Sequence, residues 1–70
     1  MTQKDYFVYE TKCRRCGKFH VWVYGEAEES KAFLFVVRMA EMLKYPPQNP
    51  CKKCKKDTIQ ELVSYGREKI

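Results

Sequence analysis

The chain has 70 residues, a net charge of +5 at pH 7, four cysteines and one histidine. A chain of this length is expected to form a single domain, residues 1–70, and such small domains often need a metal ion, disulfides or a partner subunit for stability. With one histidine, no phosphate-binding glycine loop and no run near the roughly 18 apolar residues of a membrane span, the composition argues against an enzyme and against a membrane protein.

The first third of the chain predicts a β-hairpin. Residues 6–11 and 19–24 are rich in aromatic and β-branched side chains, which favour strands. Between them lies a short turn that includes Gly17, a residue free to adopt positive φ. The first cysteines fall in this turn, so we expect them at the tip of the hairpin.

The middle of the chain predicts a helix over residues 27–44, a segment without glycine or proline. Glu28 and Glu29 suit the positive end of a helix dipole, and Lys44 suits the negative end. Pro46 ends the helix because proline disfavours helical geometry in the residue before it. Residues 46–50 contain all three prolines and are expected to form a stiff connector.

The segment 57–65 supports two interpretations. Residues 62–65 have strand-forming chemistry, whereas Thr58 and Glu61 have the spacing of a helix capping box. We favour a strand, because an isolated two-stranded hairpin is marginally stable and a third strand would complete a sheet. The predicted fold is therefore a small metal-stapled α+β domain with the order ββαβ, in which the last element could alternatively be a helix.

Two Cys-x-x-Cys pairs, Cys13/Cys16 and Cys51/Cys54, predict the staple. No secretory signal precedes them, so we expect a cytoplasmic protein in which thiols stay reduced and paired cysteines bind a metal. Two such pairs supply the tetrahedral sulfur set that Zn²⁺ prefers, and no coordination position is left open for catalysis. Iron in a similar site, or two disulfides, are the alternatives. His20 is expected to be a strand residue with an ordinary hydrogen bond.

These pairs and their flanking strands resemble the zinc ribbon group of zinc finger domains. The resemblance rests on residues 13–18 and 51–56 and leaves out the middle helix. It implies a structural zinc and a binding role towards nucleic acid or protein. Zinc ribbons usually have glycine after the second cysteine of each knuckle. Gly17 fits this pattern but Lys55 does not, so the second turn is expected to be strained or to open a helix as in treble-clef domains.

Basic residues gather around the cysteines and indicate a nucleic-acid surface. Their proximity to the turns suits contact with DNA or RNA phosphates, although they also offset the negative charge of four thiolates. Seven of the 14 Lys and Arg residues belong to this group, namely Arg14, Arg15, Lys18, Lys52, Lys53, Lys55 and Lys56.

Surplus apolar residues indicate a second kind of surface. Apolar side chains cover roughly 220° of the predicted helix, more than a helix with one buried stripe requires. Phe35, Met39 and Met42 are therefore candidate interface residues, with a homodimer as the simplest partner. The strand 19–24 likewise has apolar side chains on both faces. The alternative interpretation is a helix wrapped by the sheet and the C-terminal tail.

The leading hypothesis from these features is a small structural-zinc protein that binds nucleic acid or acts as a transcription-associated accessory factor. The alternative hypothesis is a protein-interaction module or homodimer that uses the surplus apolar helix or sheet face. No small-molecule substrate is indicated.

Overall fold

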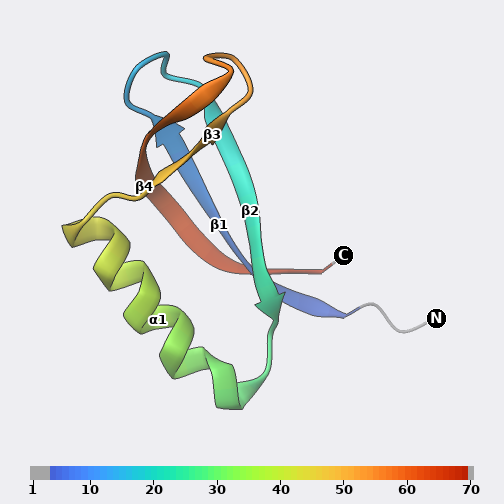
Figure 1. Ribbon diagram of the computed structural model, residues 1–70. Helices are drawn as coiled ribbons and strands as arrows, with labels where there is room; N and C mark the ends of the chain where they lie inside the picture. The colour runs from blue at the N-terminus through green and yellow to red at the C-terminus, as the bar shows by residue number, and fades with distance from the viewer. Residues whose placement is uncertain (1–3, 70) are drawn as a thin grey trace.

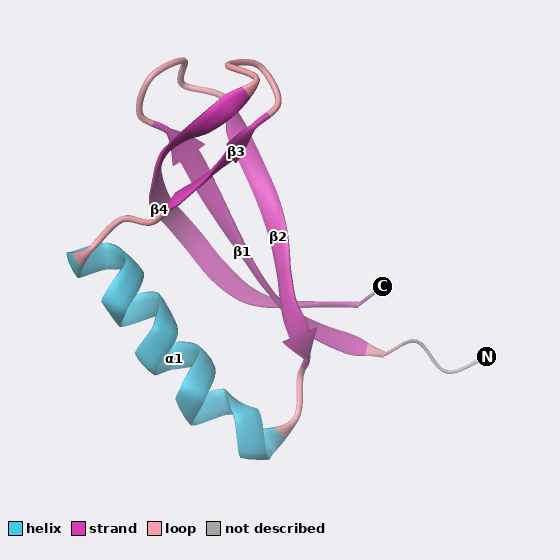
Figure 2. Ribbon diagram, viewed as in Figure 1, coloured by secondary structure: helices cyan, strands magenta, loops and turns pink. Residues whose placement is uncertain are grey.

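The computed structural model describes residues 4–69, which form four strands and one helix. The strands make one antiparallel sheet in the order β2-β1-β4-β3, and the helix lies along one side of it (Figures 1 and 2). The ββαββ order confirms the predicted α+β class and adds one strand to it. The elements are β1 Asp5–Cys13, β2 Phe19–Glu26, α1 Glu29–Lys44, β3 Gln48–Cys51 and β4 Lys56–Lys69.

The hairpin and the helix lie where the sequence predicts them, with shifted ends. β1 and β2 extend beyond the predicted ranges, because β1 pairs with a neighbour on each side over most of its length. The helix begins two residues later than predicted. The backbone N–H of Ala27 donates to the carbonyl of Asp5 at 2.9 Å, which holds this residue in the sheet, and Glu28 has extended dihedrals.

The proline-rich connector contains a strand that the sequence analysis did not predict. β3 pairs with the start of β4, and Pro50 lies opposite Asp57 in this ladder. Proline lacks a backbone donor and is tolerated only at the edge of a sheet. β3 is an edge strand, which explains how a segment that contains Pro50 can join the sheet.

The C-terminal segment is a strand, as preferred, and it runs from residue 56 to residue 69. Its pairing with β1 shifts register between Glu10 and Thr11, which leaves Val63 without a partner. Leu62 packs on the core next to the helix, and the Tyr65 ring lies 5.6 Å from the Phe35 ring. Two residues three apart therefore face the same side of the sheet, which a regular strand does not allow.

The core lies between α1 and the β1–β4 half of the sheet. Its centre is Phe35, whose ring stacks on Phe7 with a centroid distance of 4.6 Å and also contacts Tyr24. Met39 and Met42 complete the buried cluster. The three predicted interface residues on the helix are therefore buried against the protein's own sheet, because they form the helix stripe that faces it.

The apolar surface that the sequence indicated belongs to their neighbours instead. In α1, five large apolar side chains are between 37% and 76% exposed, namely Phe33, Leu34, Val36, Val37 and Leu43. On the other side of the sheet, Phe19, Val21 and Val23 are more than half exposed. Within the described residues, no helix has the length and apolarity needed to cross a membrane.

Candidate metal centre

Two hairpin tips bring the four cysteines together. β1 and β4 run antiparallel, so the β1–β2 turn and the β3–β4 turn lie at the same end of the molecule (Figure 1). Cys13 ends β1 and Cys51 ends β3, while Cys16 and Cys54 lie within the turns that follow. The four sulfurs lie within 4.8 Å of one another, and Cys13 and Cys51 are buried. The predicted convergence of the two pairs is confirmed.

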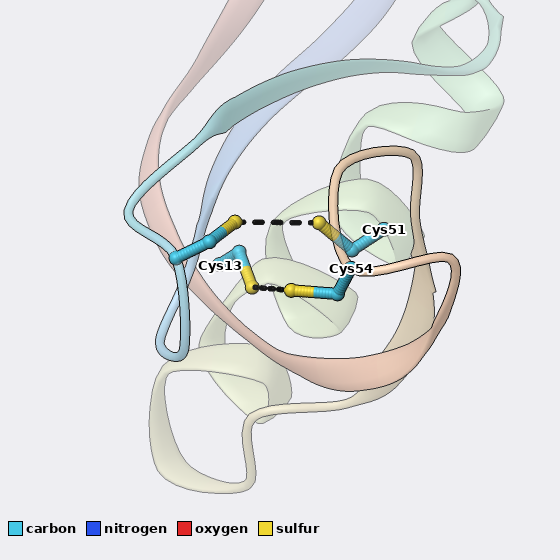
Figure 3. A group of neighbouring side chains, drawn as sticks. Cys13, Cys51 and Cys54 are labelled. Carbon is cyan, nitrogen blue, oxygen red and sulfur yellow. Dashed lines mark hydrogen bonds between the residues drawn. The ribbon is translucent and has the colours of Figure 1, made fainter.

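The distances between the sulfurs suit a metal ion rather than disulfides. The sulfurs of Cys13 and Cys54 are 3.9 Å apart, and those of Cys16 and Cys51 are 3.5 Å apart (Figure 3). Four sulfurs at about 2.3 Å from a tetrahedral zinc ion lie roughly 3.8 Å from one another. A disulfide requires about 2.05 Å, and all four cysteines are free. The group can hold one metal ion, and its donor set suits zinc.

The two turns share one backbone shape. The N–H of Gly17 donates to the carbonyl of Cys13 at 2.9 Å, and the N–H of Lys55 donates to the carbonyl of Cys51 at 2.8 Å. Both donors have positive φ, 80° for Gly17 and 57° for Lys55. The second turn therefore keeps the knuckle shape at the cost of strain in a residue with a Cβ, and no helix begins there.

A chain of hydrogen bonds ends on the sulfur of Cys13. Trp22 Nε1 donates to Thr11 Oγ1 at 2.9 Å, and Thr11 donates to Gln60 Oε1 at 3.0 Å. Gln60 Nε2 then donates to Thr58 Oγ1 at 3.0 Å, which leaves the Thr58 hydroxyl proton for Cys13 Sγ, also at 3.0 Å. Trp22 can only donate and a thiolate can only accept, so every donor in the chain has one acceptor. The chain orients the Thr58 hydroxyl towards the metal site.

The surroundings shift the pKa values of the cysteine thiols in different directions. The Thr58 hydroxyl lowers the pKa of Cys13 to about 5, although burial opposes this effect. The backbone N–H of Cys54 likewise lowers the pKa of Cys51. Burial raises the pKa of Cys54 to about 12, and the neighbouring sulfurs raise it further. Without a cation, thiolates on all four residues would repel one another. A bound metal ion removes this conflict.

Sequence reasoning identified the four cysteines but missed the polar residues whose hydrogen-bond chain ends on Cys13. Thr11, Thr58 and Gln60 are buried, although polar side chains usually remain exposed. A signal existed, since Thr11 precedes Cys13 by two residues and Thr58 precedes Gln60 by two, which is the strand period. His20 lies outside the cysteine cluster, as predicted. Its Nε2 is buried and, among the described residues, lacks the hydrogen bond that we expected.

The seven basic residues predicted as a nucleic-acid surface are all exposed and lie on or beside the two turns. They surround the four-cysteine end of the molecule, and we call this group of seven the basic rim. One member, Arg14, donates from Nε to Glu61 Oε1 at 2.6 Å. Asp57 lies beside Lys56 in the sequence. Seven exposed cations outnumber these two neighbouring carboxylates, so the rim carries net positive charge.

Comparison of this chain with protein-family models, curated proteins and solved structures found no match. The likeness to zinc ribbons thus rests on the cysteine spacing and on the four-sulfur cluster. This is a small domain with a candidate metal site, and no family is assigned to it.

Proposed function

We propose that the protein is a structural-zinc protein whose basic rim binds the phosphates of nucleic acid. Four protein sulfurs fill a tetrahedral coordination sphere, which supports a structural rather than a catalytic ion. Elemental analysis with native mass spectrometry of untagged protein tests the metal. One zinc per chain is expected, whereas iron at equal stoichiometry would replace zinc in the proposal.

The single observation that carries the nucleic-acid proposal is the placement of the basic rim. Seven cations from segments far apart in sequence gather at one end of a protein whose net charge is only +5. Four thiolates around Zn²⁺ carry a net charge of −2, so the rim exceeds what the metal site needs for compensation. Clustered Lys and Arg side chains bind a phosphate backbone through release of counterions.

An open hollow between the first turn and the β3–β4 strands supports the same proposal. It has a volume of about 320 Å³, and its lining has three cations and one acidic residue, namely Arg14, Arg15, Lys56 and Asp57, together with Gln48, Thr58 and Ile59. Two guanidinium groups beside this hollow suit planar, bidentate recognition of a phosphate. Arg15 forms no ion pair among the described residues, so its donors are available to such a ligand.

Fluorescence anisotropy with labelled single-stranded RNA, single-stranded DNA and duplex DNA tests this proposal. We expect the affinity of the zinc-loaded protein to fall steeply as salt is raised. Arg15→Ala combined with Lys53→Ala is expected to weaken binding to all sequences and to reduce the salt slope by about two.

The matched control removes two cations from the opposite end of the molecule. Lys4→Ala combined with Lys69→Ala gives the same net charge, and both residues lie away from the turns. This control variant should retain most of the affinity for nucleic acid. If both double variants weaken binding equally, the interaction depends on net charge alone and the basic rim is not a site.

A further inference from the structure

The outer face of α1 carries an ordered apolar seam. At 100° per residue, the buried side chains of Phe35, Met39 and Met42 fix the direction that faces the sheet. The opposite half of the helix contains a row at spacings of three and four, with Ser30 and Glu41 along one edge of it. We call this row the outer seam, and it consists of Glu29, Phe33, Val36, Val37, Ala40 and Lys44.

The outer seam is symmetric about its own centre. The helix runs from residue 29 to residue 44, so its midpoint lies between residues 36 and 37. When two copies of such a helix pack antiparallel about this midpoint, each seam position meets its mirror position. The meeting pairs are Glu29 with Lys44, Phe33 with Ala40, and Val36 with Val37.

Each of these pairs is complementary. Glu29 and Lys44 carry opposite charges, and both are exposed at the two ends of the helix. Phe33 is 76% exposed and would project over the small side chain of Ala40. The two valines are alike and would meet at the centre. Solvent exposure alone does not require a row of side chains to match itself in charge and size when it is read in the opposite direction.

We propose that α1 binds α1 of a second copy of this chain, antiparallel, with a twofold axis between Val36 and Val37. The twofold axis forms each contact twice and closes the interface, as in most homodimers. Antiparallel helix dipoles also attract each other. The four-cysteine ends then point in opposite directions, so this dimer is independent of the proposed nucleic-acid surface.

The exposed side of the sheet is a less suitable partner for the outer seam than a second α1. Val21 and Val23 lie on the side of the sheet away from α1. If the outer seam of one copy covered this side of the next copy, the contact would be head-to-tail and would produce a ring or an open filament rather than a twofold pair. One helix per partner buries less than the ~800 Å² of a standard interface, so a weak and concentration-dependent dimer is expected.

Sedimentation velocity of the zinc-loaded protein, from low micromolar to near-millimolar concentration, measures this association. A reversible monomer–dimer equilibrium is expected. A strict monomer throughout that range would overturn the proposal.

Charge reversal tests the antiparallel register. Glu29→Lys and Lys44→Glu each place like charges opposite one another at both ends of the pair, so each should weaken the homodimer roughly tenfold. The double variant with both changes should restore the affinity of the original protein. An equimolar mixture of the two single variants should form a heterodimer. In a parallel pair position 29 meets position 29, and each single change would only replace one pair of like charges with another. Single variants that dimerise as tightly as the original protein, or a double variant that is not rescued, therefore contradict the proposed geometry.

Val37→Glu supplies a test at the centre of the seam, with Val21→Glu as its matched control on the sheet. The first change is expected to leave only monomer, and the second to leave the dimer constant within about twofold. The absorption spectrum of the cobalt-substituted protein shows that both variants keep the four-cysteine site. If Val21→Glu abolishes the dimer and Val37→Glu does not, the sheet is the interface and the proposal is wrong.

Discussion

The four-cysteine end and α1 differ in how far their side chains find partners within the chain. At the four-cysteine end, two sulfurs are buried and Thr11, Thr58 and Gln60 all have hydrogen-bond partners within the chain. Along α1, three large side chains are buried and five large apolar ones remain exposed. The four-cysteine end needs only a cation to be complete, whereas the helix retains apolar surface that its own sheet does not cover.

This difference separates what stabilises the fold from what it offers to partners. Buried polar groups are costly unless they are paired, so the hydrogen-bond chain at the metal end leaves little freedom for change. Exposed apolar side chains contribute little to the stability of a monomer and are available for association. Substitutions at the four-cysteine end should therefore change stability, whereas substitutions on the exposed side of α1 should change association.

Removal of the metal ion is expected to have the largest effect. Binding of a structural zinc can contribute on the order of 10 kcal/mol to folding, and a 70-residue chain has little core to replace it. A strong chelator should abolish the cooperative thermal transition measured by circular dichroism. Return of zinc should restore it. A chelated, metal-free protein with an unchanged transition would refute a stabilising role of the metal.

The two sides of the helix are compared by two truncations of the same residue type. Phe35→Ala removes the ring at the centre of the core and should lower the free energy of unfolding by about 3–5 kcal/mol. Phe33→Ala removes an exposed ring and should change it by less than about 0.5 kcal/mol. Thermal unfolding in excess zinc, at a concentration where the protein is monomeric, provides both values. Equal losses would mean that α1 packs differently.

Thr58→Val tests the hydrogen-bond chain. The substitution removes the hydroxyl donor to Cys13 at nearly constant volume, and loss of such outer partners typically lowers metal affinity 10–100-fold. Competition with a chromophoric chelator measures this affinity. Thr58→Ser keeps the hydroxyl and should retain most of it. If both variants bind zinc like the original protein, the hydroxyl does not support the site.

The sequence predicted local features that depend on neighbouring residues. The hairpin, the helix and the cluster of four cysteines follow from composition, dipole preferences and cysteine spacing, and each is present. The helix face was not predictable in the same way. The apolar arc includes both Phe35 and Phe33, and only the packing of α1 on β1 and β4 decides which of them is buried.

The features that sequence reasoning missed depend on contacts distant in the chain. β3 exists because the edge of the sheet beside β4 accepts a segment that contains Pro50. The register shift opposite Val63 gives residues 57–65 a mixed period, which explains why their pattern fitted both a helix and a strand. The hydrogen-bond chain joins Thr11 to Gln60 across two strands, and no local pattern places these residues together.

The smallest predicted effect concerns the strain in the second turn. Lys55 has φ 57°, a conformation that costs a residue with a Cβ more than it costs glycine. Lys55→Gly should stabilise the zinc-loaded protein by about 0.5–1 kcal/mol, because relief of this strain exceeds the added freedom of the unfolded chain. Lys55→Ala removes the same charge but keeps the Cβ, so it should give no such gain.

The first turn allows the reverse change, from glycine to a residue with a Cβ. Gly17 has φ 80°, and a Cβ there would meet only Lys12 Cε at 3.8 Å, an ordinary contact. Gly17→Ala should therefore destabilise by about 1 kcal/mol through backbone strain alone. Both turns end on the same backbone hydrogen bond, so the two substitutions should have opposite signs in thermal unfolding. A gain from Lys55→Ala equal to that from Lys55→Gly would assign the effect to charge in the basic rim rather than to backbone strain.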